Sequence, residues 1–175
     1  VLHMYVDCLF VQQEGFHKPS EFTSLMNTIE EKTGIPIALE GVFKWVAFLA
    51  SKRDARVPVP NQYFGAFQDG TLKYRGIELR RRDTTLWVRK IQLKALEVLA
   101  GANTPHEFAD RIPDVMALAE CAKQELRIGL VPLEELVIRQ RLSRTIEAYK
   151  TPSPAARAAL QLQAHGRQFA PGQSL

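Results

Sequence analysis

Apolar residues follow two different spacings along the chain, and the change of spacing predicts two parts. Residues 1–11, 43–50, 63–67 and 72–77 are short runs rich in aliphatic and aromatic side chains, which predict β-strands. Gln68-Asp69-Gly70 separates the last two runs and predicts a hairpin turn, because glycine supplies the positive φ of a tight turn.

The other residues of the first part predict a further strand, a loop and a helix. We expect a strand over 35–39 that turns at Glu40-Gly41, and a loop over 56–62, which contains two prolines. The helix is predicted to begin at Ser20, its N-cap, and to end at Gly34. This part is therefore expected to be α+β with an antiparallel sheet.

After Asp83 the apolar residues change to helical spacing, so the second part is predicted to be mainly helical. Gly101 ends the first helix, and Thr104-Pro105 is a typical N-cap followed by proline at the first helical position. The predicted helices are 85–100, 105–126 with an interruption at Pro113, 132–137 and 153–165.

Composition limits the class of protein. The 175 residues are 46% hydrophobic, enough for a real core, and no apolar run approaches the roughly 20 residues that span a bilayer. We therefore expect no membrane partner. Cys8 and Cys121 lie far apart, which argues against a zinc site or disulfide framework and favours a reduced cytoplasmic protein, associated with the nucleoid if the source is prokaryotic.

Charge is mildly basic overall, with a net charge of +4, but it is concentrated. Only Glu78 and Asp83 oppose the basic residues between positions 73 and 94. Such a local excess favours a phosphate-rich partner, with an ordinary solvated surface as the alternative. The basic residues of this segment are Lys73, Arg75, Arg80, Arg81, Arg82, Arg89, Lys90 and Lys94.

Three segments in order resemble family B DNA polymerases. In the first, Val1–Val11, the family has Tyr-Gly-Asp-Thr-Asp-Ser between two apolar strands; here Asp7 takes the place of the second Asp, Cys8 that of the Ser, and Tyr5 that of the first Asp. Because a hairpin over this segment would expose Asp7 at its tip, a tip residue without a metal is the alternative interpretation.

The second segment contains Lys52-Arg53, Tyr63 and then Arg75-Gly76-Ile77-Glu78, followed by Arg80-Arg81-Arg82-Asp83. It is similar to the family's Lys-Lys-Arg-Tyr strand, glycine hairpin, Lys-Gly-Ile-Glu and Arg-Arg-Asp. An insertion around 54–60 separates Lys52-Arg53 from Tyr63. The third segment resembles the family thumb through Leu133–Ile138, Leu142-Ser143, Tyr149-Lys150 and Ser153-Pro154.

The resemblance implies a palm fragment over residues 1–84, an antiparallel sheet with a packed helix, followed by a mainly helical thumb over 85–175. It also implies that Asp7 is a catalytic ligand of Mg²⁺, since hard cations prefer oxygen ligands. Its partner carboxylate would precede Val1, so we expect the isolated chain to be inactive. Tyr5 cannot act as a carboxylate ligand.

The resemblance further implies primer–template DNA as the partner, with a deoxynucleotide triphosphate bound in the full-length enzyme. Minor-groove contacts test base pairing without reading sequence, and phosphate contacts position the duplex; Tyr63 could instead be an ordinary strand aromatic, and Arg81 could pair with Asp83. The DNA-binding candidates are Lys52, Arg53, Tyr63, Arg75, Arg80, Arg81, Arg82, Arg139, Arg141, Ser143, Tyr149, Lys150 and His165.

Three hypotheses follow for function. The first is a fragment of a DNA-directed DNA polymerase, used in replication or repair, that transfers nucleotides to a primer 3′-hydroxyl with two Mg²⁺ ions. The second is a non-catalytic polymerase-like DNA-binding or scaffolding module with a degenerate metal site. The third is an unrelated basic α+β domain that contacts a protein or RNA. We also expect that the fragment can form a dimer through surface that the rest of the protein once covered.

Overall fold

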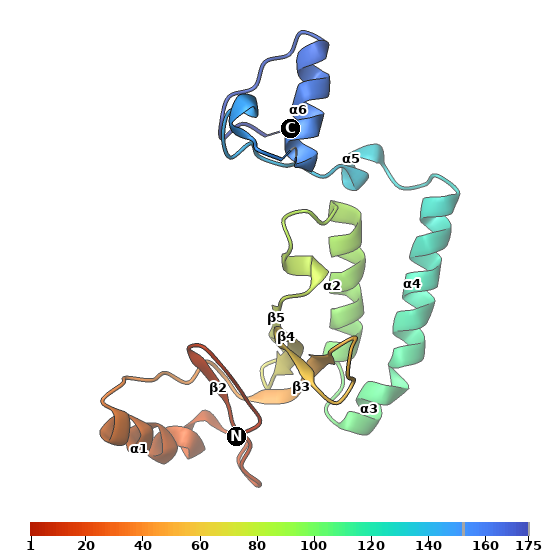
Figure 1. Cartoon of the computed structure of the whole chain (residues 1–175). Coiled ribbons are helices and arrows are strands. Elements are labelled where there is room, and N and C mark those ends of the chain that lie inside the picture. Colours follow the sequence, from red (N-terminus) through yellow and green to blue (C-terminus); the bar gives the residue numbers. More distant parts are fainter. Residues whose placement is uncertain (152, 175) are drawn as a thin grey trace. The chain divides into compact units, whose positions relative to one another are not determined.

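A computed structural model describes residues 1–151 and 153–174 and shows an α+β chain with two small antiparallel sheets (Figure 1). It divides into two compact units, Val1–Ile77 with Leu93–Cys121, and Glu78–Gln92 with Ala122–Leu175. The predicted α+β class is confirmed. The predicted palm–thumb boundary at residue 84 concerns subdomains of a whole polymerase and stays a prediction.

The first sheet is a two-stranded hairpin of β1 (His3–Tyr5) and β2 (Cys8–Phe10). His3 pairs with Phe10 and Tyr5 with Cys8, which leaves Val6 and Asp7 in the turn. Val6 has a φ of 48°, the left-handed conformation that such a tight turn requires. The predicted hairpin with Asp7 at its tip is therefore confirmed.

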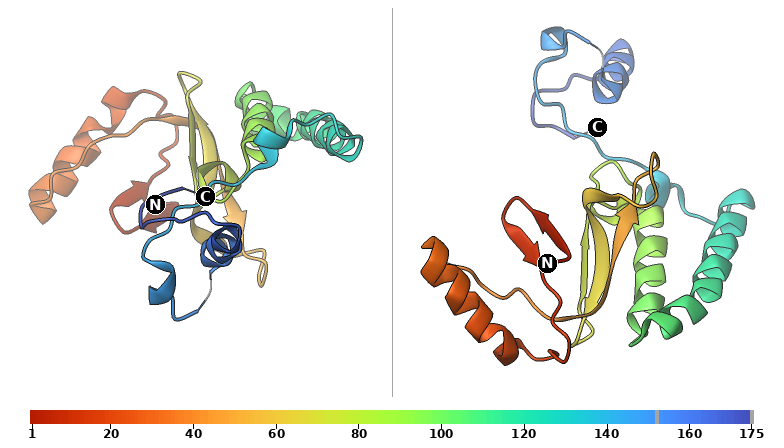
Figure 2. Two further views of the ribbon diagram at one scale, coloured as in Figure 1. Left: turned by 90° about the horizontal axis from the view of Figure 1, so that it is seen from above. Right: turned by 60° about the horizontal axis from the view of Figure 1, so that its bottom comes forward.

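The second sheet has the order β3-β4-β5, formed by Phe43–Ala50, Pro58–Phe67 and Leu72–Arg75 (Figure 2). The hairpin predicted at 68–70 is confirmed, with Gly70 at a φ of 86°. The predicted loop over 56–62 is wrong from Pro58 onward, because β4 begins there. β5 pairs only with residues 63–66 of β4, so the two prolines lie where β4 has a single neighbour and a missing N–H is tolerated.

The predicted strand over 35–39 is also wrong, since those residues have no regular secondary structure. The apolar alternation there is real, but Pro36 lacks a backbone donor. Within residues 1–151 and 153–174, no strand pairs with this segment. An apolar pattern alone therefore does not make a strand when no neighbouring edge is available.

The helix predicted after Ser20 begins with a 3₁₀ turn over Pro19–Phe22 and continues as α1 (Thr23–Thr33). Ser20 lies inside that turn, so its predicted role as N-cap is wrong. Glu21 caps the turn instead, because its carboxylate accepts the backbone N–H groups of His17 and Lys18, each at 2.6 Å. Gly34 ends the helix at a φ of 69°, as predicted.

Aromatic side chains hold the first unit together. Phe10 of the hairpin lies 5.2 Å from Phe48 and 5.1 Å from Tyr63, between ring centroids, so β2 packs against the β3–β4 sheet. On Trp45 of β3, Phe108 packs at 4.8 Å. Edge-to-face arrangements of this kind add to the burial of apolar area.

The second part of the chain is helical, as predicted. The predicted interruption at Pro113 lies instead at Arg111, between α3 (Pro105–Asp110) and α4 (Ile112–Arg127). Pro113 lies in the first turn of α4, where proline is tolerated. Thr104 caps α3 by accepting the N–H of Glu107 at 3.1 Å. The helices are α2 (Leu86–Ala100), α3 (Pro105–Asp110), α4 (Ile112–Arg127), α5 (Leu133–Leu136) and α6 (Pro154–Ala164).

Residues 139–151 and 153–174 form a small folded region of the second unit, here called the C-terminal lobe. Its core is Leu142, which is 1% exposed, against Ala155 and Ala159 of α6. Leu142 also donates its backbone N–H to the Gln173 carbonyl at 3.1 Å. The lobe is thus closed by backbone bonds between its two ends and by a core of one large and several small side chains.

No helix in the part of the chain that the structure describes is long and apolar enough to cross a membrane.

Candidate nucleic-acid interface

Asp7 lies exposed at the tip of the β1–β2 hairpin, between two short strands that fix its backbone. Cys8 donates its thiol hydrogen to the Tyr5 carbonyl at 3.2 Å, across the same turn. Among the described residues, no three histidine, cysteine, aspartate or glutamate side chains gather as a metal site would require. One exposed carboxylate does not make a two-Mg²⁺ centre, so no catalytic step is assigned within this chain.

The candidates on the β3–β5 sheet lie in different environments. Lys52 and Arg53 are exposed in the loop between β3 and β4, and Arg75 is exposed at the end of β5. Tyr63 stands opposite Arg75 in the sheet but is only 4% exposed, within the aromatic cluster around Phe10. Its burial is what an ordinary strand aromatic shows, and its predicted minor-groove contact stays a prediction.

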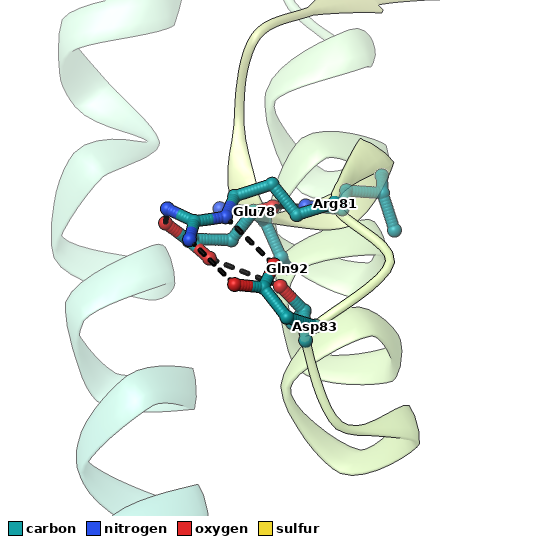
Figure 3. A network of polar contacts seen from close by, with 6 residues as sticks. Glu78, Arg81, Asp83 and Gln92 are labelled. Carbon is teal, nitrogen blue, oxygen red and sulfur yellow. Dashed lines mark hydrogen bonds and ion pairs between the residues drawn. The ribbon is translucent and has the colours of Figure 1, made fainter. Parts of the chain in front are cut away.

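Arg81 lies at the centre of a polar network in the segment before α2 (Figure 3). Its guanidinium makes a two-point contact with Asp83, from Nε to Oδ1 at 3.0 Å and from Nη2 to Oδ2 at 2.7 Å. A further bond of 3.1 Å runs from Nη1 to Glu78 Oε1, and the Thr84 hydroxyl donates to Glu78 Oε2 at 3.0 Å. The alternative interpretation of Arg81, a pair with Asp83, is confirmed.

This network changes the pKa of its members. The hydrogen bonds and charge of Arg81 lower the pKa of the Asp83 carboxyl below its ordinary value, and Asp83 and then Glu78 raise the pKa of Arg81. Both acidic residues that oppose the basic segment are therefore committed to one arginine. Arg80 and Arg82 are exposed on either side of it, and no ion pair to them is found among the described residues.

Two further contacts tie the segment to α2. The Leu79 backbone N–H donates to the Gln92 side-chain oxygen at 2.5 Å, and Arg89 donates to the Arg81 carbonyl. Of the other basic residues, Lys90 pairs with Glu135 at 2.5 Å and Lys73 pairs with Glu40. The basic segment therefore presents fewer unpaired cations than its sequence indicates.

The C-terminal lobe contains the remaining candidates. Ser143 and Tyr149 are joined twice: the Ser143 backbone N–H donates to the Tyr149 hydroxyl oxygen at 3.0 Å, and the two hydroxyls lie 3.1 Å apart. The bonds from Ser143 lower the pKa of Tyr149. Exposed residues of the lobe include the predicted Arg139, Arg141, Lys150 and His165.

Sequence reasoning missed Arg144. Its guanidinium carbon lies 5.6 Å from the centroid of the Tyr149 ring, in cation–π contact. The residue belongs to none of the motifs that carried the resemblance. A short 3₁₀ helix, Ile146–Ala148, lies between Arg144 and Tyr149, so their proximity is a property of the fold.

Comparison with known proteins defines the class to which this α+β chain with exposed basic loops belongs. The sequence profile described as DNA polymerase family B matches residues 7–171. The chain belongs to DNA polymerase family B, as the three ordered segments predicted. Because the match covers nearly the whole chain, it does not depend on the altered motif around Asp7.

Individual relatives agree with this assignment. The chain is 24% identical over 172 residues to DNA polymerase 1 of Saccharolobus solfataricus, covering 98% of this chain and 18% of that protein. It is 26% identical over 166 residues to the DNA polymerase of Archaeoglobus fulgidus, covering 95% of this chain and 19% of that protein. The chain thus spans about a fifth of the length of these relatives.

A solved structure shows the same fold. The family B DNA polymerase from the hyperthermophilic archaeon Pyrobaculum calidifontis superposes with a TM-score of 0.57 at 23% sequence identity. The match covers 90% of this chain and 19% of that one. The likeness shows that the arrangement of helices and strands is that of a segment of such a polymerase.

Proposed function

We propose that the chain is the palm and thumb part of a DNA-directed DNA polymerase, with the palm over residues 1–84 and the thumb over 85–175. Its proposed task is to bind primer–template DNA through the phosphate backbone. The family match over residues 7–171 is the observation that carries this proposal. The exposed arginines on both sides of the Arg81 network support it, since guanidinium groups suit phosphate oxygens.

Contacts of this kind hold a duplex without reading its sequence, as a polymerase requires. Arg80 and Arg82 are the strongest candidates for binding phosphate. Arg81 pairs with both nearby carboxylates, those of Glu78 and Asp83, so neither carboxylate neutralises Arg80 or Arg82. Lys52 and Arg53, exposed in the β3–β4 loop, are further candidates. Tyr63 contributes at least by packing the sheet on which these loops are mounted.

Nucleotidyl transfer belongs to the whole polymerase in this proposal. There, Asp7 would be one Mg²⁺ ligand beside carboxylates that this chain does not supply, and the ions would stabilise the charge that develops during phosphoryl transfer. The deoxynucleotide triphosphate would also be bound by the whole enzyme. The isolated chain is expected to be inactive.

A non-catalytic module is the second candidate function, and Tyr5 favours it. Tyr5 takes the family position of the other carboxylate and is 36% exposed in the hairpin. Primer extension by the full-length parent protein, with and without Asp7→Asn, separates the two candidates. Loss of extension in the variant supports the ligand role of Asp7, and unchanged extension excludes it. A wild-type parent that does not extend the primer supports the non-catalytic module.

DNA binding by the 175-residue chain tests the proposal itself. Fluorescence anisotropy with a labelled primer–template duplex at about 50 mM salt should give measurable affinity. The affinity should fall as salt is raised, because protein cations that bind DNA phosphates displace counterions from the DNA. Absence of binding under these conditions would contradict the proposal and favour the unrelated basic domain.

The predicted dimer remains a proposal, and the exposed apolar surface of the β1–β2 hairpin supports it. The β1–β2 hairpin exposes Met4 by 72% and Leu9 by 44%, and Val6 by 88% at its turn. Exposed apolar surface of this kind favours association. Light scattering across a range of concentrations decides between a monomer and a dimer.

A further inference from the structure

The C-terminal lobe has an unusual charge balance for a region of its size. Six arginine and lysine residues lie within positions 139–174, opposed by Glu147 alone, so its net positive charge exceeds the +4 of the whole chain. The cations are Arg139, Arg141, Arg144, Lys150, Arg157 and Arg167. A general attraction for phosphate follows from this balance, but it does not single out a site.

Tyr149 provides the fixed point from which a site can be defined. Its ring packs against the core formed by Leu142, Ala155 and Ala159. Its hydroxyl is held by the backbone N–H and the side chain of Ser143, at 3.0 and 3.1 Å. The Tyr149 ring is therefore fixed by its packing against the core and by the two hydrogen bonds between its hydroxyl and Ser143.

Arg144 lies over this ring and is exposed to solvent. Its guanidinium carbon lies 5.6 Å from the ring centroid and the residue is exposed. No carboxylate contact to Arg144 is found in the part of the chain that the structure describes. Its guanidinium N–H groups are therefore available for two-point binding of an anion.

We propose that Arg144, held on the Tyr149 ring, binds one phosphate of the primer–template backbone, with the Ser143 hydroxyl as a second donor. Tyr149 is then a positioning residue rather than a DNA ligand. The inference rests on the proposed function, because it names a site for the DNA that the chain is proposed to bind. The pre-ordered guanidinium loses less conformational freedom on binding than a free arginine does.

The test is duplex binding by the 175-residue chain, measured by anisotropy over a salt series. Arg144→Gln should weaken binding by about tenfold, as for a hydrogen-bonded charge, and should reduce the slope of log affinity against log salt by about 0.9. Arg144→Lys should keep the salt slope, because lysine retains the positive charge. It should lose most of the affinity that Arg144 contributes, because lysine lacks the paired N–H donors of the guanidinium.

Two comparisons separate this site from diffuse charge. Arg157→Gln is the matched control, since Arg157 is an exposed arginine of α6 in the same lobe, and it should have a much smaller effect. Tyr149→Leu should weaken DNA binding when it is introduced into the wild-type chain. It should have no further effect when it is introduced into the Arg144→Gln variant, because the ring acts only through the Arg144 guanidinium. Circular dichroism checks that each variant is folded.

Equal losses in Arg144→Gln and Arg157→Gln, or additive losses in the Tyr149 double variant, would overturn the inference while leaving DNA binding intact. An Arg144→Gln variant that binds like wild type would do the same. A wild-type chain that does not bind the duplex would overturn the proposed function, and this inference with it.

Discussion

Neutralising Arg81 together with Asp83 should leave the salt dependence of DNA binding unchanged, although Arg81 stands in the middle of a run of three arginines. The reason is the two-point contact with Asp83 at 3.0 and 2.7 Å and the additional bond to Glu78 at 3.1 Å. A guanidinium engaged in this way has few donors left for a phosphate. The variant Arg81→Gln with Asp83→Asn removes the pair without changing the net charge.

The expected magnitude follows from counterion release. Each phosphate contact to duplex DNA adds about 0.9 to the slope of log affinity against log salt, so losing one changes the affinity ratio between 50 and 200 mM salt by about 3.5-fold. Arg80→Gln and Arg82→Gln should each show that change, and the Arg81–Asp83 double variant should show none.

The assay is anisotropy with one labelled duplex at four or more salt concentrations, using wild type and the three variants. A thermal unfolding curve for each variant controls for loss of the segment's structure. The reasoning would be refuted if the Arg81–Asp83 variant lost as much slope as Arg80→Gln, since Arg81 would then contact a phosphate despite its intramolecular partners.

The structure makes three further predictions. Leu142→Ala should destabilise the C-terminal lobe by about 3 kcal/mol, because a fully buried leucine leaves a cavity; amide hydrogen exchange in α6 measures this, and a loss below about 1 kcal/mol would contradict it. Gly76→Ala should lower the free energy of unfolding in urea more than Gly70→Ala does. Both glycines have positive φ, but only at Gly76 would the new methyl group meet the Asn61 carbonyl. Equal losses of stability would show that this close approach to Asn61 is unimportant. Asp83 should titrate below the ordinary aspartate pKa by carboxyl NMR, so the stability from its pair is present above about pH 4 and lost as pH falls through the folded pKa; a normal pKa that Arg81→Gln does not change would exclude the pair in solution.

Local sequence signals predicted most of the elements. The helices over 86–100 and 154–164 have both apolar spacing and capping residues, and the hairpin at 68–70 has turn residues between matched runs. The hairpin at 6–7 was expected from the family pattern, because Val6 is not a typical turn residue. The failures at 35–39 and 58–62 have a common cause. Whether an extended segment becomes a strand depends on which neighbour pairs with it, and a single sequence does not give the pairing.

The candidate site was predictable to the level of residue types but not of contacts. The family pattern located the arginine run before Asp83, and the Arg81–Asp83 pair was one of two interpretations of Arg81. The contact of Arg144 with Tyr149 could not be predicted, because it depends on how residues 143–149, which include a short 3₁₀ helix, fold over the lobe core. The burial of Tyr63 likewise depends on Phe10, which lies more than fifty residues earlier.

A structure of this chain bound to a primer–template duplex tests the central claim most directly. We expect backbone phosphates within hydrogen-bonding distance, about 3 Å, of Arg80, Arg82 and Arg144, with Arg81 still paired to Asp83. A duplex that lies on another face of the chain, or phosphates that contact none of these three arginines, would contradict it.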